Sequence, residues 1–227
     1  MNIRYAAEQL LDLLFPTLCV GCAKPGGEVL CRQCLARLAS SCDRHEFETP
    51  GTRVRSETRV SGIRAAGIYR GELKEMVLGL KSSCRPFGVP LARLMVSAAG
   101  NDPCYVAPDL ITYVPSERRK IIERGYNPAE LLARKVAQLL GRPLANCLVK
   151  VRLTEDQDRL PAPDRWENIE GAFNVRTGFR PSGPVLLIDD VLTTGATAAG
   201  CAGALLDSGA ESVHALVAAR AVLDSGL

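Results

Sequence analysis

The chain has 227 residues, of which 47% are hydrophobic and 23% charged, so its composition is ordinary for a globular protein. The net charge of +3 is too small to indicate nucleic-acid binding by itself, and no apolar run reaches the roughly 18 residues that a membrane helix needs. Because Glu8 and Asp12 interrupt the apolar N-terminal stretch and the cysteines are locally spaced, we expect a cytoplasmic protein without a signal peptide or membrane span.

The N-terminal part is rich in cysteine. Residues 3–15 place apolar side chains on one helical face, which predicts a docking helix. Two Cys-x-x-Cys pairs follow, eight residues apart, and they consist of Cys19, Cys22, Cys31 and Cys34. This spacing predicts a tetrahedral thiolate site for structural Zn²⁺, and the scarcity of large apolar residues nearby predicts a head that needs metal to fold. Disulfide formation is the alternative, which a reducing compartment disfavours.

Cys42 and His45 continue the pattern with Cys-x-x-His spacing. They are either remnants or half of a second metal site, because no further ligand pair appears before Tyr69. Residues 43–60 are charged and poor in large apolar side chains, which favours a linker or an exposed loop. We therefore predict two units, residues 1–60 with the helix, cysteine head and linker, and residues 61–227 with an α/β domain.

The second unit alternates strand and helix patterns. Strands are predicted at 63–69, 109–115, 144–150, 171–175, 185–188 and 212–219, and helices at 72–81, 91–98 and 128–140. Pro128 suits the first turn of the last of these helices, and Gly141 suits its end. The apolar strands and their alternation with helices predict an α/β fold with a mainly parallel sheet covered on both faces. His214 alternates with apolar neighbours, so we expect it in the core or at a sheet edge.

A cationic segment follows the strand at 109–115. It carries Arg118, Arg119, Lys120 and Arg124 and is closed by Gly125. Arginines at the end of a parallel strand suit pyrophosphate, because the guanidinium fork pairs with phosphate oxygens. Arg124 is the better candidate, and Lys120 fits a solvated loop. Residues 152–168 are polar and contain prolines, which predicts a loop or lid over the same edge of the sheet.

Two carboxylates and a hydroxyl-rich turn follow the strand at 185–188. Asp189 and Asp190 come directly after the apolar run, and Thr193-Thr194-Gly195-Ala196-Thr197 leads into a helix of small residues. Open α/β sheets bind ligands at the carboxyl ends of their strands, and the free N–H groups of a helix start bind phosphate. Acceptors for two hydroxyls beside donors for a phosphate predict a site for a ribose 5-phosphate.

This pattern resembles the phosphoribosyl pyrophosphate (PRPP) motif of type I phosphoribosyltransferases. The order of elements along the whole chain is similar to that of the ComF (competence protein F) family, and the cysteine pairs also fit that family. The matching motifs are Val114-Pro115, Arg124-Gly125-Tyr126-Asn127, Thr154 with Gln157 and Leu160, Arg165 with Asn168, and Asp189 to Thr197. There are departures: Pro128 stands where the family often has glutamine, and Arg152 lies two residues before the lid threonine, not three.

The resemblance implies roles for individual residues. In the phosphoribosyltransferases the acids hold the ribose hydroxyls and the turn holds the 5-phosphate. The implied PRPP- or phosphate-binding residues are Asp189, Asp190, Val191, Thr193, Thr194, Gly195, Ala196 and Thr197. The implied pyrophosphate or lid residues are Arg118, Arg124, Gly125, Thr154 and Gln157.

The resemblance also implies a function. Members of the ComF family are associated with DNA uptake, so we expect cytoplasmic handling of imported single-stranded DNA, with a phosphoribosyl or nucleotide ligand and a DNA-uptake helicase as partner. An alternative is an active phosphoribosyltransferase that uses PRPP and Mg²⁺ to glycosylate a nitrogen acceptor, which the sequence does not identify. A zinc-ribbon scaffold with a vestigial site is a third hypothesis, and the intact acids and turn argue against it.

Overall fold

The computed structural model describes residues 16–26, 28–41, 59–152, 169 and 171–221. Several predicted features lie outside these residues: the docking helix at 3–15, the pair Cys42 and His45, and the lid residues Thr154 and Gln157, together with Leu160, Arg165 and Asn168. Within the described residues, no helix combines the length and the apolar content that crossing a membrane requires.

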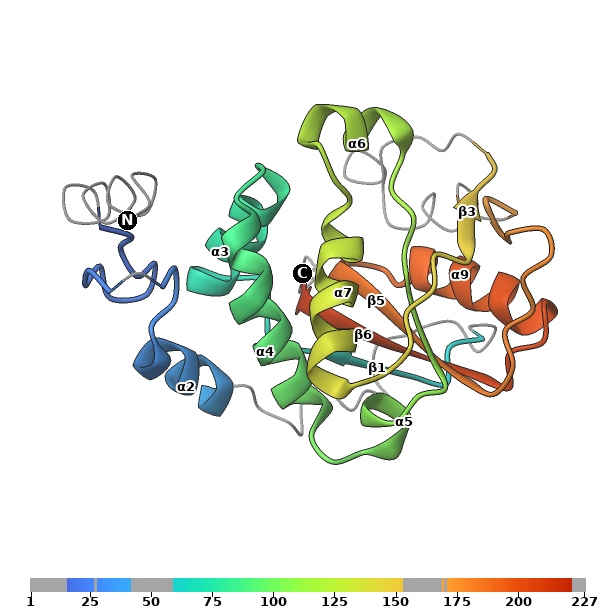
Figure 1. Cartoon of the computed structure of the whole chain (residues 1–227), viewed down its shortest axis with the longest axis horizontal. Coiled ribbons are helices and arrows are strands. Elements are labelled where there is room, and N and C mark those ends of the chain that lie inside the picture. Colours follow the sequence, from blue (N-terminus) through green and yellow to red (C-terminus); the bar gives the residue numbers. More distant parts are fainter. Residues whose placement is uncertain (1–15, 27, 42–58, 153–168, 170, 222–227) are drawn as a thin grey trace, which may run out of the picture.

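A four-stranded parallel sheet forms the centre of the molecule (Figure 1). Its strands, in spatial order, are β1 (Gly62–Ala65), β6 (Ser212–Arg220), β5 (Pro184–Leu192) and β2 (Leu110–Tyr113). Ile188 of β5 is in register with Tyr113 of β2 on one side and with Leu216 of β6 on the other. β5 is therefore an inner strand, which explains why its first residues are apolar without interruption.

Helices cover both faces of this sheet. Leu186 and Ile188 of β5 pack in one core with α3 (Gly71–Lys81), α4 (Gly88–Ala99) and α7 (Pro128–Leu140). Val185 and Leu187 pack in a second core with α9 (Ala196–Asp207). The alternation follows from the two-residue period of a strand. The predicted α/β fold is confirmed. The short elements that complete it are η1 (Arg85–Phe87), α5 (Pro103–Val106) and α6 (Arg118–Arg124).

The predicted strands at 144–150 and 171–175 do not extend the parallel sheet. β3 (Leu148–Lys150) and β4 (Phe173–Val175) pair with each other in an antiparallel hairpin. Leu144 makes only a single parallel bridge to Ile111 of β2 before the chain turns away. The hairpin packs on the α9 side through Leu148 and Phe173, so it forms one wall of the edge where β2 and β5 end.

The ends of α7 follow the sequence signals. The Asn127 side chain accepts a hydrogen bond from the backbone N–H of Ala129, and Pro128 occupies the first turn. Gly141 ends the helix in the left-handed conformation, with φ +63°.

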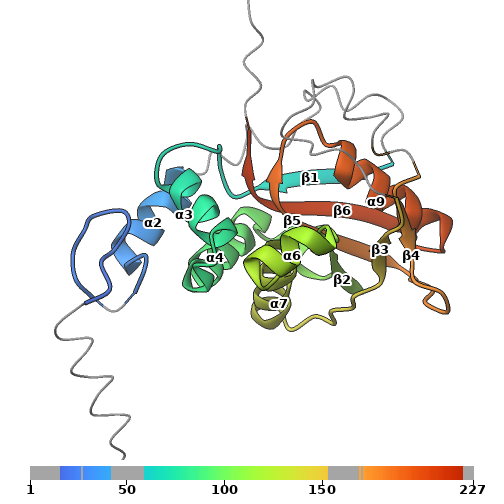
Figure 2. The same cartoon turned by 90° about the horizontal axis from the view of Figure 1, so that it is seen from above.

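The cysteine head packs against the α/β body through α2 (Arg32–Ser41). In Figures 1 and 2 it lies beside α3 and α4. Cys19, Leu30 and Cys34 belong to the same apolar core as α3, α4 and α7, and Arg37 of α2 forms a 2.6 Å ion pair with Glu72 of α3. The described part of the head therefore shares a core with the body, and the division at residue 60 stays a prediction.

Candidate functional site

The acid pair lies at the carboxyl end of β5, in a cavity of about 180 Å³. Six of the eight residues predicted to bind phosphoribose line this cavity, and they are Asp189, Asp190, Val191, Thr193, Gly195 and Thr197. Thr194 and Ala196 are not among the lining residues, but the Thr194 hydroxyl accepts a 3.4 Å hydrogen bond from the Ala196 N–H and so shapes the turn. The sheet edge thus brings carboxylates and a hydroxyl-rich turn to one cavity.

Gly195 places the start of α9 at the cavity. It is the N-cap residue and has φ +83°, a conformation that glycine adopts without steric cost. It has no side chain with which to cap the helix. Thr197 and Ala198 in the first turn line the cavity, and α9 is 12 residues long. N–H groups at such a helix start suit a phosphate.

The two carboxylates differ in their surroundings. Burial raises the pKa of Asp189, and the negative charge of Asp190 raises it further. The backbone N–H of Asp190 donates to Asp189 Oδ1 at 2.8 Å, and this bond and the positive charge of Lys81 act in the opposite direction. The net effect is a pKa of Asp189 that is raised above the ordinary value of an aspartic acid.

Lys81 is a site residue that the sequence did not indicate. It is the last residue of α3, and its Nζ lies 3.6 Å from Asp190 Oδ1. Both side chains are largely buried, with 26% and 15% exposure. No spacing links Lys81 to the acid motif, because the contact depends on how α3 packs across the sheet. From the sequence, only the buried face of this helix, with Leu73, Val77 and Leu80, was predictable.

Cations also line the wall formed by the segment after β2. Arg124 and Lys120 line the cavity, as does Lys150 of β3, whose Nζ forms a 2.6 Å ion pair with Glu117. Arg118 lies elsewhere, in the lining of a neighbouring cavity. Of the predicted pyrophosphate residues, the structure therefore brings Arg124 to the acid pair and does not bring Arg118 to the same cavity.

The Arg-Gly-Tyr-Asn box holds this wall in place. The buried Asn127 side chain donates to the Val114 carbonyl at 2.9 Å and accepts from the Ser116 hydroxyl at 2.9 Å. The Tyr126 hydroxyl donates to the Leu80 carbonyl, next to Lys81. Gly125, with φ +78°, ends α6 in the left-handed conformation. The box thus ties the loop after β2 to both α3 and α7.

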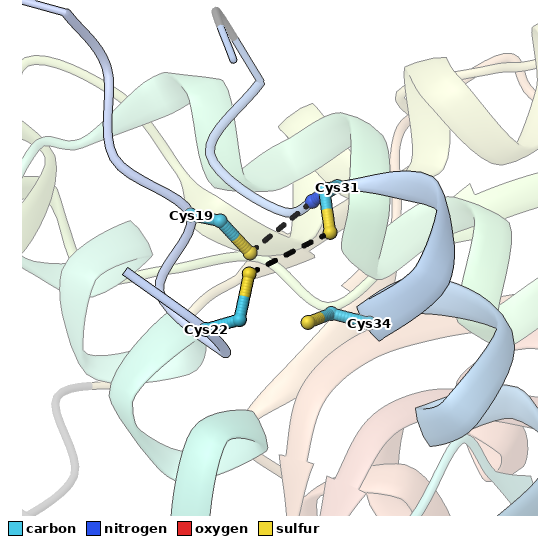
Figure 3. Close-up of side chains that lie close together, drawn as sticks. All are labelled: Cys19, Cys22, Cys31 and Cys34. Carbon is cyan, nitrogen blue, oxygen red and sulfur yellow. Dashed lines mark hydrogen bonds between the residues drawn. The ribbon is translucent and has the colours of Figure 1, made fainter. Parts of the chain in front are cut away.

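The four head cysteines converge on one point (Figure 3). Their sulfur atoms all lie within 4.8 Å of one another, and Cys22 Sγ and Cys31 Sγ are 3.9 Å apart. Sulfurs in a tetrahedral site with Zn–S bonds of about 2.3 Å are separated by about 3.8 Å, whereas a disulfide requires about 2.05 Å. All the described cysteines are free thiols. The cluster therefore fits a metal ion and not a pair of disulfides.

Backbone N–H groups prepare one of these sulfurs for a metal. Burial by itself would raise the pKa of Cys19, but N–H groups of Cys31, Gly21 and Cys22 donate to its sulfur and lower the pKa to about 6. The Cys31 N–H lies 3.3 Å from Cys19 Sγ. A thiolate is the form that binds metal, so these N–H groups favour coordination by Cys19, whereas burial and the neighbouring cysteine sulfurs raise the pKa of Cys34.

His214 lies away from the site. It is in the first half of β6, opposite Gly62 of β1, whereas the acids are at the carboxyl end of β5. Its ring meets Tyr105 edge-on at 5.3 Å, and burial lowers its pKa. The expectation of a structural histidine agrees with this position.

Comparison with known proteins places the chain among DNA-utilization and competence proteins, although no family model matches it. It is 30% identical over 210 residues to DNA utilization protein YhgH of Salmonella typhi, covering 87% of this chain and 82% of the relative. It is 36% identical over 117 residues to Competence protein F of Haemophilus influenzae, covering 50% and 51%. It is 25% identical over 224 residues to Competence protein ComFC of Bacillus subtilis, covering 96% and 84%. The chain therefore belongs to the ComF family.

Proposed function

We propose that the chain acts in DNA utilization of the competence type and binds a phosphoribosyl or nucleotide ligand at the acid pair while handling imported single-stranded DNA in the cytoplasm. The names of the relatives support the first part of this proposal. The observation that supports the second part is the cavity that Asp189 and Asp190 share with the Thr193–Thr197 turn. A DNA-uptake helicase is the partner that the family resemblance suggests.

The cavity offers a complementary partner for each group of a ribose 5-phosphate. The first turn of α9 has N–H groups and the Thr197 hydroxyl for the phosphate, and the turn before it adds the Thr193 hydroxyl. The carboxylates at the end of β5 accept hydrogen bonds from the sugar hydroxyls. Lys120, Arg124 and Lys150 lie on the wall formed by the loop after β2 and by β3, where they suit further phosphate oxygens.

An active phosphoribosyltransferase is a second candidate function, and the same cationic wall favours it. In that reaction a nitrogen nucleophile forms a bond to C1 of PRPP, while the C1–O bond breaks and pyrophosphate departs with the electron pair. Arg124 would stabilise the departing charge, and the acids would orient the ribose. PRPP would enter with Mg²⁺, for which carboxylate and phosphate oxygens are suitable ligands.

Structural zinc is the metal that we propose for the cysteine head. The four cysteine sulfurs lie within 4.8 Å of one another, so all four could bind one zinc ion. Four thiolate ligands would leave no open position on the metal, which is typical of a structural site and not of a catalytic one. Zinc would then stabilise the face that the head presents to α3 and α4, because Cys19 and Cys34 belong to that apolar core.

A thermal-shift titration tests the ligand proposal. PRPP with Mg²⁺, ribose 5-phosphate and a nucleoside monophosphate are each added to the full chain. A ligand at 100 times its Kd contributes about 2.7 kcal/mol, which corresponds to a rise in Tm of roughly 5–10 °C for a chain of this length. Asp190→Asn should abolish the shift, and the matched control Glu211→Gln, on the exposed surface, should retain it. The absence of a shift with every ligand at millimolar concentration would refute the site.

A separate measurement distinguishes the two candidate functions. Phosphorus NMR of PRPP incubated with the protein, Mg²⁺ and a panel of nitrogen heterocycles reports the release of pyrophosphate. Acceptor-dependent release that Arg124→Gln slows would favour the transferase. Binding without release would favour a ligand-binding role in DNA handling.

A further inference from the structure

Two side chains between α3 and α4 contact the end of α6, which lies about forty residues further along the chain. The Ser83 hydroxyl donates to the Arg124 carbonyl at 3.1 Å, and Arg85 Nη2 donates to the Gly125 carbonyl at 3.2 Å. The Arg85 guanidinium also lies over the Tyr126 ring, with Cζ 4.8 Å from the ring centroid. Ser83 and Arg85 thus hold three consecutive residues at the junction of α6 and α7.

These contacts determine where α6 ends. None of the seven residues of α6 is buried, so the helix is not anchored by a buried side chain of its own. The last carbonyl groups of a helix have no partners within it. Arg124 is the last residue of α6 and Gly125 is its C-cap, and both of their carbonyls accept hydrogen bonds from the segment between α3 and α4. The position of this helix end therefore depends on polar contacts with a distant segment.

Ser83 has an unusual backbone conformation at this contact. Its φ is +74°, in the left-handed region that residues with a side chain seldom adopt. The next residue supports the turn, because the Cys84 N–H donates to the Gly79 carbonyl at 2.9 Å. Glycine would adopt this backbone without steric cost, but it would lack the hydroxyl that binds the Arg124 carbonyl. Strained residues are common near ligand sites, where the surrounding structure maintains them.

The other side of the contact is firmly anchored beside the acid pair. Helix α3 packs in the core through its buried residues Leu73, Met76, Val77 and Leu80. Its last residue is Lys81, which lies 3.6 Å from Asp190 and only two residues before Ser83. The segment that holds the end of α6 therefore begins at a fixed point of the site, and it places Arg124 relative to the two carboxylates.

Ser83 and Arg85 act at a distance from the cavity. Both are exposed and neither lines it, whereas Arg124 is partly buried and does line it. Any effect of these two residues on a ligand must pass through the backbone that they hold. Arg124 lies on the cationic wall, away from the helix start that suits the 5-phosphate, so its guanidinium suits an additional phosphate group.

We propose that Ser83 and Arg85 are positioning residues that hold Arg124 against a second phosphate group of the ligand. They thereby set the preference of the cavity for a pyrophosphate-bearing sugar over a sugar monophosphate. This inference rests on the proposed function of the cavity as a phosphoribosyl or nucleotide site, and it assigns part of the ligand specificity to residues outside the cavity.

Calorimetry on the full chain in the presence of Mg²⁺ tests this by comparing PRPP with ribose 5-phosphate. The double variant Ser83→Ala/Arg85→Gln should lower the affinity for PRPP about tenfold and the affinity for ribose 5-phosphate by less than about twofold. The control Ser82→Ala/Arg93→Gln changes the same residue types at exposed positions that do not line the cavity, and it should bind both ligands as the native chain does.

Two further variants separate positioning from stability. Ser83→Gly removes the hydroxyl together with the steric cost of the positive φ, so it should unfold at no lower temperature than Ser83→Ala. It should nevertheless weaken the binding of PRPP more than that of ribose 5-phosphate. In an Arg124→Gln background, Ser83→Ala/Arg85→Gln should cause no further loss of affinity for PRPP, because both residues act through Arg124.

The outcomes distinguish this inference from the proposed function. Equal losses for the two ligands, an unchanged affinity for PRPP, or a further loss in the Arg124→Gln background would each overturn the inference and leave the ligand site in place. If the native chain binds neither ligand, the proposed function is refuted and the inference with it.

Discussion

The ammonium group of Lys81 lies 3.6 Å from a carboxylate oxygen of Asp190, across the junction between helix α3 and strand β5. This contact brings a positive charge from the N-terminal half of the body to the acid pair. The same helix forms an ion pair with the cysteine head through Glu72 and Arg37. Helix α3 thus contacts both the acid pair and the cysteine head.

Replacement of Lys81 by methionine should weaken ligand binding at the acid pair. Loss of the ammonium group removes an influence that lowers the pKa of Asp189, so more of the Asp189 carboxyl stays protonated at pH 7. We expect an affinity about tenfold lower at pH 7, from a charge-assisted contact of about 1.5 kcal/mol, and a partial recovery at pH 9. Calorimetry with ribose 5-phosphate measures this. Lys74→Met, on an exposed position of the same helix, is the control, and an equal effect of the two variants would contradict the assignment.

The raised pKa of Asp189 should make the ligand-free protein less stable as the pH rises. Its folded pKa of about 8 exceeds the ordinary value of 3.8, so between these values the folded chain holds a proton that the unfolded chain has released. The free energy of unfolding therefore decreases with rising pH across this window. Asp189→Asn should raise Tm at pH 8 by at least about 2–4 °C, corresponding to about 1 kcal/mol, and by much less at pH 4. Calorimetric scans check this, with Asp207→Asn, which is exposed and paired with Arg59, as control. A pH-independent difference would refute the buried proton.

Removal of one head cysteine should release the metal. Cys22 is the exposed member of the cluster, and Cys104 is an exposed cysteine outside it. Elemental analysis should give about one zinc per native chain, far less for Cys22→Ser, and no change for Cys104→Ser. Chelation should lower Tm in the native chain and have little effect on Cys22→Ser. If the native chain is purified without metal and also fails to bind added zinc, the assignment of a zinc site to the cysteine cluster is wrong.

Gly21 should be required because Cys34 packs closely against it in the cysteine cluster. A Cβ atom at this position would lie 3.0 Å from Cys34 Sγ and 3.1 Å from Cys34 Cβ, whereas a Cβ at Gly26 would meet no atom within 4 Å. Gly21→Ala should therefore displace Cys34 and reduce zinc affinity by about tenfold. Gly26→Ala should leave the affinity unchanged. Competition with a coloured chelator measures both, and equal affinities of the two variants would contradict the prediction.

Two glycines of α9 should respond in opposite directions to substitution by alanine. A Cβ at Gly200 would lie 2.6 Å from Ile169 Cγ2 and 3.1 Å from Phe173 Cδ2, so Gly200→Ala should cost about 1–3 kcal/mol. A Cβ at Gly203 has its nearest neighbour at 4.0 Å, and Gly203→Ala should stabilise the chain by roughly 0.5–1 kcal/mol through helix propensity. Denaturant unfolding measures the difference. A stabilising Gly200→Ala would show that α9 does not pack closely on the β4 hairpin.

Local features were predictable because neighbouring residues produce them. The buried run of β5, the acid pair at its end and the turn into α9 are contiguous in the chain, so one stretch of sequence carries strand, acids and helix start. The cap of α7 by Asn127 and Pro128, and the convergence of two Cys-x-x-Cys pairs, likewise depend on short spacings.

The sequence by itself determined a parallel α/β fold, the position of the acid motif at a strand end, and a four-thiol cluster. Only the tertiary structure decided that Lys81 meets Asp190, that Lys150 pairs with Glu117, and that Arg118 lines a neighbouring cavity. It also decided that β3 and β4 leave the parallel sheet as a hairpin. These relationships join residues far apart in the chain, and they depend on how buried faces of helices and strands pack, which the period of hydrophobic residues does not specify.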